Sequence, residues 1–390
     1  MDQLDARLAL YLTRRRLLAA GALGVAGAAA GEGTSFPGKS GLIAHRARPP
    51  LLETPLGLLG RDAFTPNDRF FVRCNNPVPA AVDVGRFRLR VFGHVARPQM
   101  LDLAQILRMP RVELAAVNQC SGNGRRFFSP RIPGAQWGHG AMGNARWLGV
   151  PLRHLLDRAG VRPGAVAVRF GGLDRPPVAG APPFLKSLSL DHARDGEVML
   201  AFGMNGEQLP LLNGFPLRLI VPGWFSTYWV KHLDAIEVLA QPDDSYFMAK
   251  TYRVPTTPHA TVAPEAKDFP TRPIERMPPR SWVTSLEPGE RVAWEPTLAI
   301  AGLALGGAHG VARVAASADG RRWVQARLGP DHGRYGFRRW EADVPIAGRG
   351  PVRLMSRCWN AAGEVQPFAP VWNPSGYARS QVEVTHVVAV

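Results

Sequence analysis

The sequence predicts an α+β protein in two parts, a mixed α/β domain followed by an immunoglobulin-like β-sandwich. Short apolar runs and a few helical segments fill roughly the first 250 residues. A proline-rich segment, residues 253–281, follows them and is typical of an extended linker. Short segments of alternating hydrophobicity then recur to the end. With 390 residues, 46% of them hydrophobic and 20% charged, the chain is long enough for two domains.

The N-terminus has the pattern of an export signal. The run Thr13-Arg14-Arg15-Arg16-Leu17-Leu18 precedes an apolar stretch rich in alanine and glycine that ends near Ala30. This stretch is too short for a stable membrane span and suits a twin-arginine signal peptide over residues 1–30, cleaved near Ala30. The alternative is an uncleaved helix or anchor. No later segment reaches membrane-spanning length, so we expect a periplasmic protein without a membrane span.

The formal charge is +16, and the first thirty residues supply +2 of it. A charge of this size raises the question of nucleic-acid binding. The arginines are scattered, however, and no nucleic-acid-binding motif occurs, which favours a solvated arginine-rich surface and no nucleic-acid partner. Such a surface still attracts small anions or an acidic partner protein, more weakly as salt increases.

The first part of the predicted α/β domain combines loops with short strands. Residues 31–65 have little periodicity, and we expect them to wrap over the surface. Phe70-Phe71-Val72 ends a strand that breaks into a loop at Arg73. Arg86–Val95 alternates between apolar and basic side chains, as in a half-buried strand, and Leu101–Leu107 predicts a short helix.

A cysteine lies in the most distinctive turn of the sequence. The apolar run Val112–Val117 predicts a buried strand, and Asn118–Gly124 breaks it into a turn that carries Cys120. Backbone N–H groups and the flanking Arg125 and Arg126 favour the thiolate. Three interpretations are open: a nucleophile, which would need a histidine brought near by the fold; a buried structural cysteine; or one thiolate ligand of a metal whose other ligands come from a cofactor.

The middle of the chain alternates glycine-rich turns with regular elements. Gly138–Gly143 formally matches GxGxxG but lacks the βαβ context of a nucleotide loop, so we interpret it as a turn packed near a cofactor. Pro151–Ala159 predicts a helix that Gly160 ends. Ala165–Phe170 predicts a strand leading to Asp174. Three further strands are predicted in the runs VMLAF, LRLIVP and WVKHLDAIEVL after Glu197.

The C-terminal segments from Trp282 onward have the spacing of a β-sandwich, with a hairpin at Asp319-Gly320. Cys358 falls in one of these strands as a small buried side chain, whereas Cys74 and Cys120 belong to the candidate site. We therefore predict no structural disulfide.

Several spaced motifs resemble the sulfite oxidase family of molybdopterin enzymes, most closely its bacterial periplasmic sulfite dehydrogenases. They are NQCSGNGR, WGHGAMGNARWLGVPL, FGGLD and DGEVMLAFGMNGEQLP, in this order. The resemblance implies a sulfite-oxidase-type molybdopterin domain over residues 31–265 and a dimerisation-type β-sandwich over residues 266–390. It also implies a molybdenum-molybdopterin cofactor, with Cys120 as the protein ligand of the metal.

The resemblance also assigns site residues. It implies catalytic roles for Arg73, Cys120, Arg125 and Tyr252. Residues implied to bind the cofactor are Phe71, Val72, Arg73, Cys74, Asn75, Cys120, Asp174, Asn213, Arg218, Trp229, Val230 and Lys231. Asp174 could instead form a turn, and Tyr252 could simply fill the domain junction.

Three residues depart from the pattern of the family. Asn75 and Asn213 stand where the family usually or often has histidine, and Ser375 stands where some animal relatives have a substrate-binding arginine. An amide forms hydrogen bonds but does not titrate near neutral pH, so these exchanges affect the expected pH dependence and substrate. Arg73 and Arg125 would then bind more of the anion.

The resemblance implies oxidation of sulfite to sulfate, with electrons passed singly to a c-type cytochrome. The sequence has no C-x-x-C-H haem site and no iron–sulfur cysteine cluster, so we expect no haem in this chain and a separate electron carrier. The alternatives are action on protein-bound sulfane sulfur or another oxo-anion, or a metal-free sulfur-carrier or electron-transfer scaffold. A homodimer and a heterodimer with a cytochrome subunit are both compatible with the resemblance.

Overall fold

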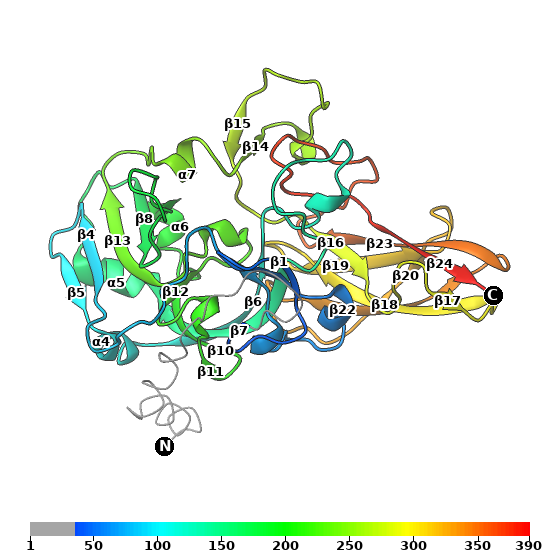
Figure 1. Cartoon of the computed structure of the whole chain (residues 1–390), viewed down its shortest axis with the longest axis horizontal. Coiled ribbons are helices and arrows are strands. Elements are labelled where there is room, and N and C mark those ends of the chain that lie inside the picture. The colour runs from blue at the N-terminus through cyan, green and yellow to red at the C-terminus, as the bar shows by residue number, and fades with distance from the viewer. Residues whose placement is uncertain (1–35) are drawn as a thin grey trace.

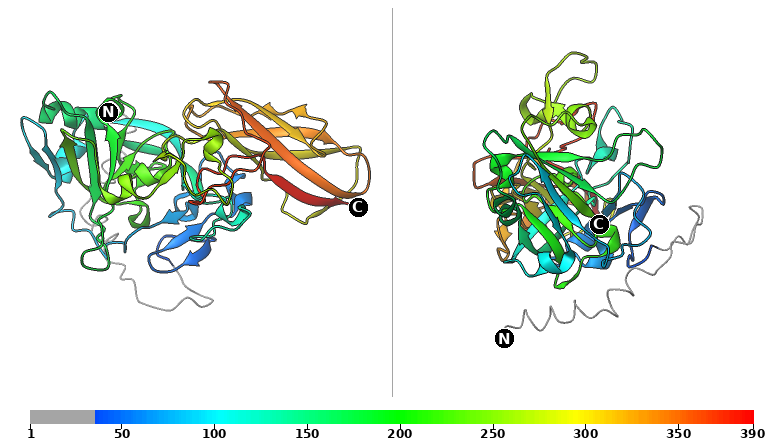
Figure 2. Two further views of the ribbon diagram at one scale, coloured as in Figure 1. Left: turned by 90° about the horizontal axis from the view of Figure 1, so that it is seen from above. Right: turned by 90° about the vertical axis from the view of Figure 1, so that its left-hand side faces the viewer.

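The computed structural model describes residues 36–390, so the predicted signal peptide lies outside the described residues. The described chain has a mixed α/β part with short helices and a β-sandwich that extends away from it (Figure 1). A second direction of view shows the sandwich as the narrow end of an elongated molecule (Figure 2). The predicted α+β fold class is confirmed.

Three sheets build the α/β part. A three-stranded sheet has the order β1-β2-β3, a second has the order β11-β10-β7-β6 with β12 also on β10, and a third has the order β5-β4-β13-β8-β9. Their strands are β1 Ile43–Arg46, β2 Leu51–Glu53, β3 Val72–Arg73, β4 Leu89–Gly93, β5 Gln99–Leu101, β6 Val112–Gln119, β7 Met142–Pro151, β8 Ala167–Gly172, β9 Lys186–Ser189, β10 Met199–Met204, β11 Glu207–Gln208, β12 Arg218–Ile220 and β13 Leu233–Leu239.

Short helices connect these strands. They are α3 Leu56–Leu59, α4 Leu103–Leu107, α5 Leu152–Ala159, α6 Leu190–Ala193 and α7 Tyr246–Ala249, with single 3-10 turns at Asn67–Arg69, Arg125–Phe127, Leu211–Asn213, Ser226–Tyr228 and Pro258–Ala260. Asp102 caps α4, because its side chain accepts from the backbone N–H of Gln105. Gly160 ends α5 in a left-handed conformation, as the sequence predicted.

The proline-rich segment and the C-terminal part consist of β-structure. Within the segment, β14 Arg253–Pro255 pairs with β15 Thr271–Pro273. Two sheets, β16-β18-β22-β21 and β17-β24-β23-β19-β20, form the sandwich and enclose a separate apolar core. Their strands are β16 Arg280–Val283, β17 Arg291–Val292, β18 Thr297–Leu305, β19 Val311–Ser317, β20 Val324–Gln325, β21 Arg327–Leu328, β22 Arg338–Pro345, β23 Gly350–Asn360 and β24 Val384–Ala389.

Three expectations from the sequence need correction. Residues 36–65 do not merely cover the surface, because β1 and β2 pair with β3 and bury Leu51 and Leu52. The strand β6 is buried only in its second half, and its first residue, Val112, is exposed. The run Trp229–His232 is not part of a strand, since β13 begins at Leu233. In each case long-range packing outweighs the local pattern.

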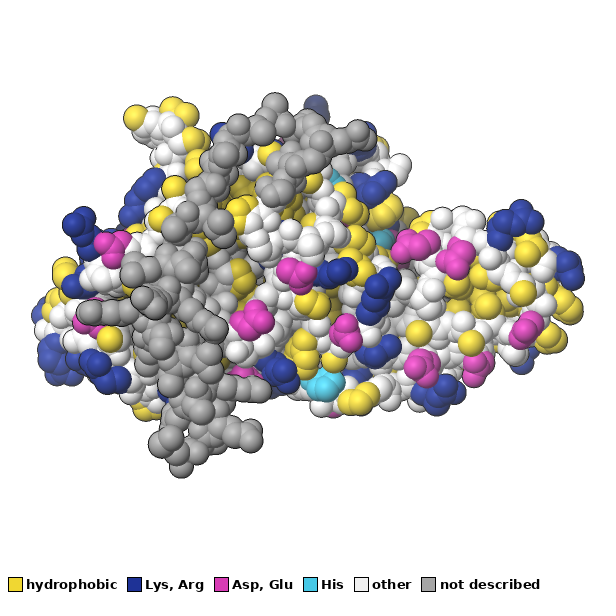
Figure 3. Space-filling model, turned by 60° about the horizontal axis from the view of Figure 1, so that its bottom comes forward, with side chains coloured by type: hydrophobic (Ala, Val, Ile, Leu, Met, Phe, Trp, Pro, Cys, Tyr) yellow, Lys and Arg dark blue, Asp and Glu magenta, His cyan; other side chains and the backbone are white. Residues whose placement is uncertain are grey.

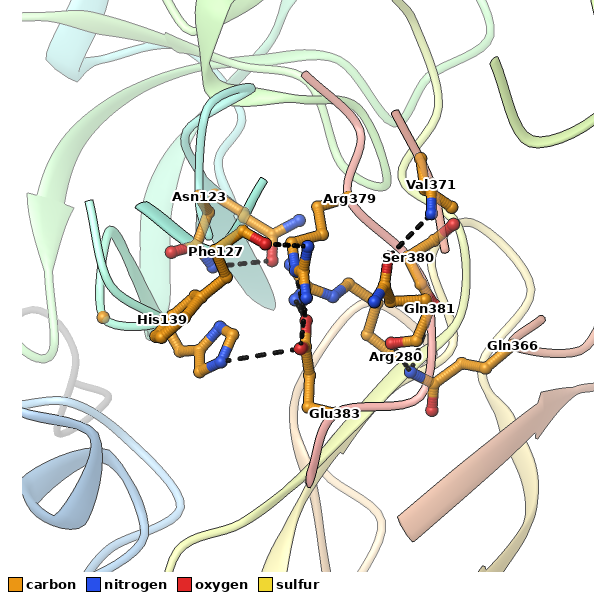
Figure 4. Close-up of polar contacts among 12 residues, drawn as sticks. Asn123, Phe127, His139, Arg280, Gln366, Val371, Arg379, Ser380, Gln381 and Glu383 are labelled. Atoms are coloured by element: carbon orange, nitrogen blue, oxygen red, sulfur yellow. Dashed lines mark hydrogen bonds and ion pairs between the residues drawn. The ribbon is translucent and has the colours of Figure 1, made fainter. Parts of the chain in front are cut away.

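A charged network joins the two parts of the chain (Figure 4). Arg379 contacts both oxygens of Glu383, at 2.8 and 2.9 Å, and Arg280 donates to the same carboxylate at 3.1 Å. Arg379 also donates to the carbonyl of Phe127, at 2.8 Å, in the turn behind Cys120. The C-terminal part therefore holds the cysteine loop in place.

The charges of this network determine its pKa values. Burial alone would raise the pKa of Glu383, but His139, Arg379 and Arg280 lower it to about 2. Burial lowers the pKa of His139 to about 4, so this imidazole is neutral at pH 7 and the two arginines balance the carboxylate.

The three cysteines of the chain, Cys74, Cys120 and Cys358, are free and buried. On the uncovered part of the face shown in Figure 3, Lys and Arg side chains are dispersed among acidic ones. Among the helices described between residues 36 and 390, none has the length and apolar character needed to cross a membrane.

Candidate active site

A cavity lies in the α/β part, among loops from all three of its sheets. Most of the residues that the motifs singled out line it. These are Phe71, Arg73, Asn75, Cys120, Asp174, Asn213, Arg218, Trp229, Lys231 and Tyr252. The fold thus brings together segments separated by up to about 180 positions in the chain, as expected for a site built on loops at sheet edges.

Cys120 follows the last residue of β6 and is 6% exposed. Its backbone N–H donates to the carbonyl of Ala141 at 2.9 Å, and its carbonyl accepts from the N–H of Asn123 at 3.0 Å. These bonds tie both sides of the turn, so the thiol has a fixed place in the wall of the cavity. Within residues 36–390 no three or more His, Cys, Asp or Glu side chains cluster as a metal site of protein ligands alone.

A glycine-rich segment supports the cysteine turn from behind. Both carboxylate oxygens of Glu53 accept backbone N–H groups, from Gly138 and Gly140, each at 2.9 Å. A Cβ atom on Gly140 would lie 1.6 Å from the carbonyl oxygen of Thr54, so only glycine fits this close approach. Burial would raise the pKa of Glu53, but hydrogen bonds from His45 and the two glycines lower it overall. The GxGxxG segment is therefore a turn whose backbone N–H groups bind the carboxylate of Glu53.

Arg73, Tyr252 and Asn75 form a polar group within the cavity. Tyr252 donates from its hydroxyl to Oδ1 of Asn75 at 3.0 Å, and Arg73 donates to the same hydroxyl oxygen at 3.3 Å. Burial by itself would lower the pKa of the Arg73 guanidinium. The nearby Tyr252 and Cys120 together have a larger effect in the other direction, so the pKa is raised overall. Tyr252 has φ of 53°, a conformation that costs a residue other than glycine about 1 kcal/mol or more and that recurs at functional sites.

The opposite side of the cavity is cationic. Arg218 is 3% exposed, its Nη1 donates to the carbonyl of Asn213 at 2.9 Å, and it lies against the rings of Trp147 and Trp229. Burial lowers its pKa to about 9, and Cys74 offsets this only in part. Lys231 donates to Sγ of Cys74 at 2.9 Å and to the carbonyl of Leu212 at 3.1 Å.

This cationic side fits the phosphate of a molybdopterin. In the described part of the chain Nε of Arg218 has no hydrogen-bond partner, and neither have Nδ2 of Asn118 and Oγ of Ser121, which also line the cavity. Buried donors without partners are costly unless a bound group satisfies them. Guanidinium and ammonium groups suit a phosphate, and the thiol of Cys120 suits a soft metal.

Asp174 lies at the edge of this cationic region. Burial raises the pKa of its carboxyl group, and Lys231 opposes that rise. The side chain of Asn76 donates to the backbone carbonyl of Asp174 at 3.4 Å, which holds the turn after β8.

Four of the predicted site residues do not line the cavity. Val72, Cys74 and Val230 are buried beside it. Arg125 donates to the carbonyls of Ala135, at 3.3 Å, and Ser375, at 3.1 Å, and lies over the ring of Tyr377. Its direct contact with an anion stays a prediction. Ser375 donates to the carbonyl of Arg253, so it joins the linker to this region.

Sequence reasoning missed three residues beside the site. Tyr377, from the C-terminal part, stacks on Tyr252 with ring centroids 5.5 Å apart. Lys186 in β9 points its ammonium at the ring of Tyr252 from 5.5 Å, and burial lowers its pKa to about 7. Lys39 reaches the cationic side from the N-terminal segment. The chain has only five lysines among many arginines, and this rarity of lysine was the available signal for Lys39 and Lys186.

Known proteins resemble this chain over nearly its whole described length. Residues 75–247 match the oxidoreductase molybdopterin binding domain, and residues 271–385 match the Mo-co oxidoreductase dimerisation domain. Sulfite oxidase of Gallus gallus is 35% identical over 359 residues, covering 87% of this chain and 76% of the relative. Sulfite oxidase of Arabidopsis thaliana is 30% identical over 350 residues, covering 83% of this chain and 88% of the relative.

A solved structure shares the fold. The sulfane dehydrogenase SoxCD of Paracoccus pantotrophus superimposes with a TM-score of 0.74 at 26% identity, covering 96% of this chain and 89% of the other. The two family models, the identity to curated relatives and this fold agree with one another. The chain belongs to the sulfite oxidase family of molybdopterin oxidoreductases, and its cofactor is molybdenum-molybdopterin.

Proposed function

We propose that this enzyme oxidises sulfite to sulfate in the periplasm and passes the electrons to a c-type cytochrome. The observation that carries the proposal is the placement of Arg73 and Tyr252 in the same cavity as Cys120. A guanidinium and a phenol beside a soft metal ligand suit a small sulfur oxyanion. The sulfite oxidases among the relatives support this substrate class.

The residues of the cavity have distinct roles in this proposal. Cys120 would hold the metal through its thiolate, and Arg218, Lys231 and Asn213, which line the same cavity, would hold the phosphate end of the cofactor. The bound cofactor supplies the oxygen-atom transfer and accepts two electrons. Overall, sulfite and water give sulfate, two protons and two electrons.

The polar group of the cavity binds the substrate in this account. Arg73 balances the charge of the anion, and its raised pKa keeps it cationic at any physiological pH. The hydroxyl of Tyr252 is shared between Arg73 and Asn75 and can turn to donate to a substrate oxygen. The guanidinium and the phenol oxygen hold their places before the substrate arrives, so only the hydroxyl hydrogen of Tyr252 has to reorient.

Comparing substrates tests the proposal. The purified enzyme, with its molybdenum content determined, is given sulfite or a protein persulfide as electron donor, and cytochrome c reduction is followed. We expect kcat/KM for sulfite to exceed that for the persulfide. Higher activity with the persulfide would overturn the sulfite assignment and leave the membership of the family intact.

Oxidation of protein-bound sulfane sulfur is the second candidate. The fold that this chain shares with a sulfane dehydrogenase favours it, and so does Asn75, an amide at a position where the family usually has histidine. The same arginine and tyrosine would then bind the terminal sulfur of a carrier, and the comparison of substrates separates the two candidates.

Export by the twin-arginine route is the remaining part of the proposal. The run Thr13-Arg14-Arg15-Arg16-Leu17-Leu18 supports it. Replacing Arg14, Arg15 and Arg16 with lysine should retain the protein in the cytoplasm of a bacterial host, while the unmodified chain is recovered from the periplasmic fraction. Equal recovery of both forms from the periplasm would contradict this route.

A further inference from the structure

The N-terminal segment before β1 reaches the cationic side of the cavity through Lys39. Lys39 is partly buried, and its ammonium group donates three hydrogen bonds. The acceptors are the carbonyls of Asn67, at 2.5 Å, and Phe70, at 3.0 Å, and Oδ1 of Asn213, at 2.6 Å. All three N–H groups of the ammonium are therefore used, and one bond ends on a residue of the cavity wall.

The bond from Lys39 decides which way the amide of Asn213 points. An ammonium group can only donate, so the oxygen of the amide must face Lys39. The NH2 group of Asn213 then points the other way, where it donates a long hydrogen bond to the carbonyl of Phe71, at 3.4 Å. Asn213 is 2% exposed and lines the cavity, so its amide can serve a bound group as a donor.

Lys39 also adds charge to this side of the cavity. The pKa of Lys39 is lowered to about 7, mainly by burial and then by the positive charge of Lys231. Arg218 also lowers this pKa, whereas the carboxylate of Asp68 raises it. Three cations this close repel one another unless an anion lies among them. A phosphate dianion would relieve that repulsion and accept from the unpartnered Nε of Arg218.

We propose that Lys39 is a positioning residue for the cofactor, which turns Asn213 so that its amide donates to the phosphate end and places a third positive charge there. The segment that carries it precedes residues 75–247, the extent of the matched molybdopterin-binding domain. The cofactor site of this chain thus includes an N-terminal strap, residues 36–40, outside that domain. The proposal depends on the cofactor and is independent of which sulfur compound is oxidised.

Substitution of Lys39 tests the effect on cofactor retention. Lys39→Met keeps the length of the side chain but removes its charge and its three hydrogen bonds. We expect the purified variant to release its pterin about tenfold faster than the wild type, as with other losses of residues that orient a ligand. The readouts are molybdenum content and released pterin fluorescence over time. Lys267→Met is the matched control, since Lys267 is exposed in the linker.

Asn213→Asp tests whether the bond from Lys39 to residue 213 orients a donor towards the cofactor or only holds the N-terminal strap in place. The carboxylate would still accept from Lys39, so the strap stays bound and the fold is preserved. It would, however, replace the donor facing the phosphate with an anionic oxygen, so we expect the variant to be purified with several-fold less molybdenum and pterin. A structural role would leave its cofactor content at the wild-type value.

Retention of the cofactor by Lys39→Met at the wild-type rate would overturn the proposal. So would wild-type cofactor content in Asn213→Asp, and that variant decides alone if Lys39→Met does not fold. Failure of the sulfite assignment would instead show in substrate turnover with cofactor content unchanged, so the two failures are distinguishable.

Discussion

The phenol of Tyr252 donates to Oδ1 of Asn75 at 3.0 Å, and this bond joins the start of the proline-rich segment to the loop after β3. Arg73 approaches the same phenol oxygen at 3.3 Å. The hydroxyl of Tyr252 thus donates to the amide of Asn75, which does not titrate. At this position the family usually has histidine, whose imidazole does titrate. In the proposed reaction, this pair contributes both to the binding of the anion and to the pH dependence of the enzyme.

Tyr252→Phe removes the hydroxyl but keeps the ring that packs on Tyr377. We expect kcat/KM for sulfite to fall about 100-fold, because a donor to the oxyanion is lost, while molybdenum content stays unchanged. Steady-state kinetics on metal-analysed protein measures this. Tyr246→Phe, at an exposed position, is the control and should leave the kinetics unaltered. Wild-type kinetics in Tyr252→Phe would remove this residue from the mechanism.

Asn75→His should introduce a new ionisation into the pH profile. A neutral imidazole can accept the bond from Tyr252, but a protonated one cannot, and the ordinary pKa of histidine is about 6.5. We expect the pH profile of kcat/KM of the variant to show an additional step near that pH, with no such step from this position in the wild type. Identical profiles for the two proteins would show that residue 75 does not contact the reacting groups.

Glu53→Gln should destabilise the turn behind Cys120. The amide nitrogen of glutamine would face the N–H of Gly138 or Gly140, which leaves a buried donor without an acceptor. The free energy of unfolding should fall by about 2 kcal/mol, measured by urea denaturation. Glu265→Gln, in the exposed linker, is the control. A variant as stable as the wild type would mean that the carboxylate does not hold this turn.

Glu383→Gln should weaken the junction between the two parts of the chain and reduce its sensitivity to acid. The pKa of Glu383 is about 2 in the folded chain, below its ordinary value of 4.5. A lowered pKa stabilises the fold above pH 4.5, here by about 3 kcal/mol, and this contribution is lost as the pH falls towards 2. The wild type should therefore lose stability between pH 4.5 and 2 more steeply than the variant.

Melting temperatures across that pH range test the prediction for Glu383. Glu341→Gln is the matched control, because Glu341 pairs with Arg327 at 3.3 Å on the exposed face of β22. Such a pair contributes at most about 1 kcal/mol. Equal acid sensitivity of Glu383→Gln and the wild type would contradict the role given to the junction.

Motifs and local patterns predicted much of the fold and the site. The residues from Phe71 to Asn75 and Tyr252 were assigned to the site by the resemblance to the family, and Cys120 also by the turn that carries it. The partners that hold them were not visible, because Lys39 contacts Asn213 across 174 positions and Tyr377 arrives from the other part of the chain. Glu53 likewise contacts a turn about 85 positions away. Local periodicity contains no information on such contacts.

The most direct test of the account is sulfite-dependent reduction of cytochrome c by the wild type and by Cys120→Ser, with molybdenum determined on the same samples. We predict an active wild type with stoichiometric molybdenum, and a folded Cys120→Ser protein that is inactive. Substantial activity of Cys120→Ser would contradict the role of Cys120 as the metal ligand. A wild type loaded with molybdenum but inactive towards sulfite would contradict the proposed reaction, and would indicate that Asn75 and Ser375 serve a different substrate.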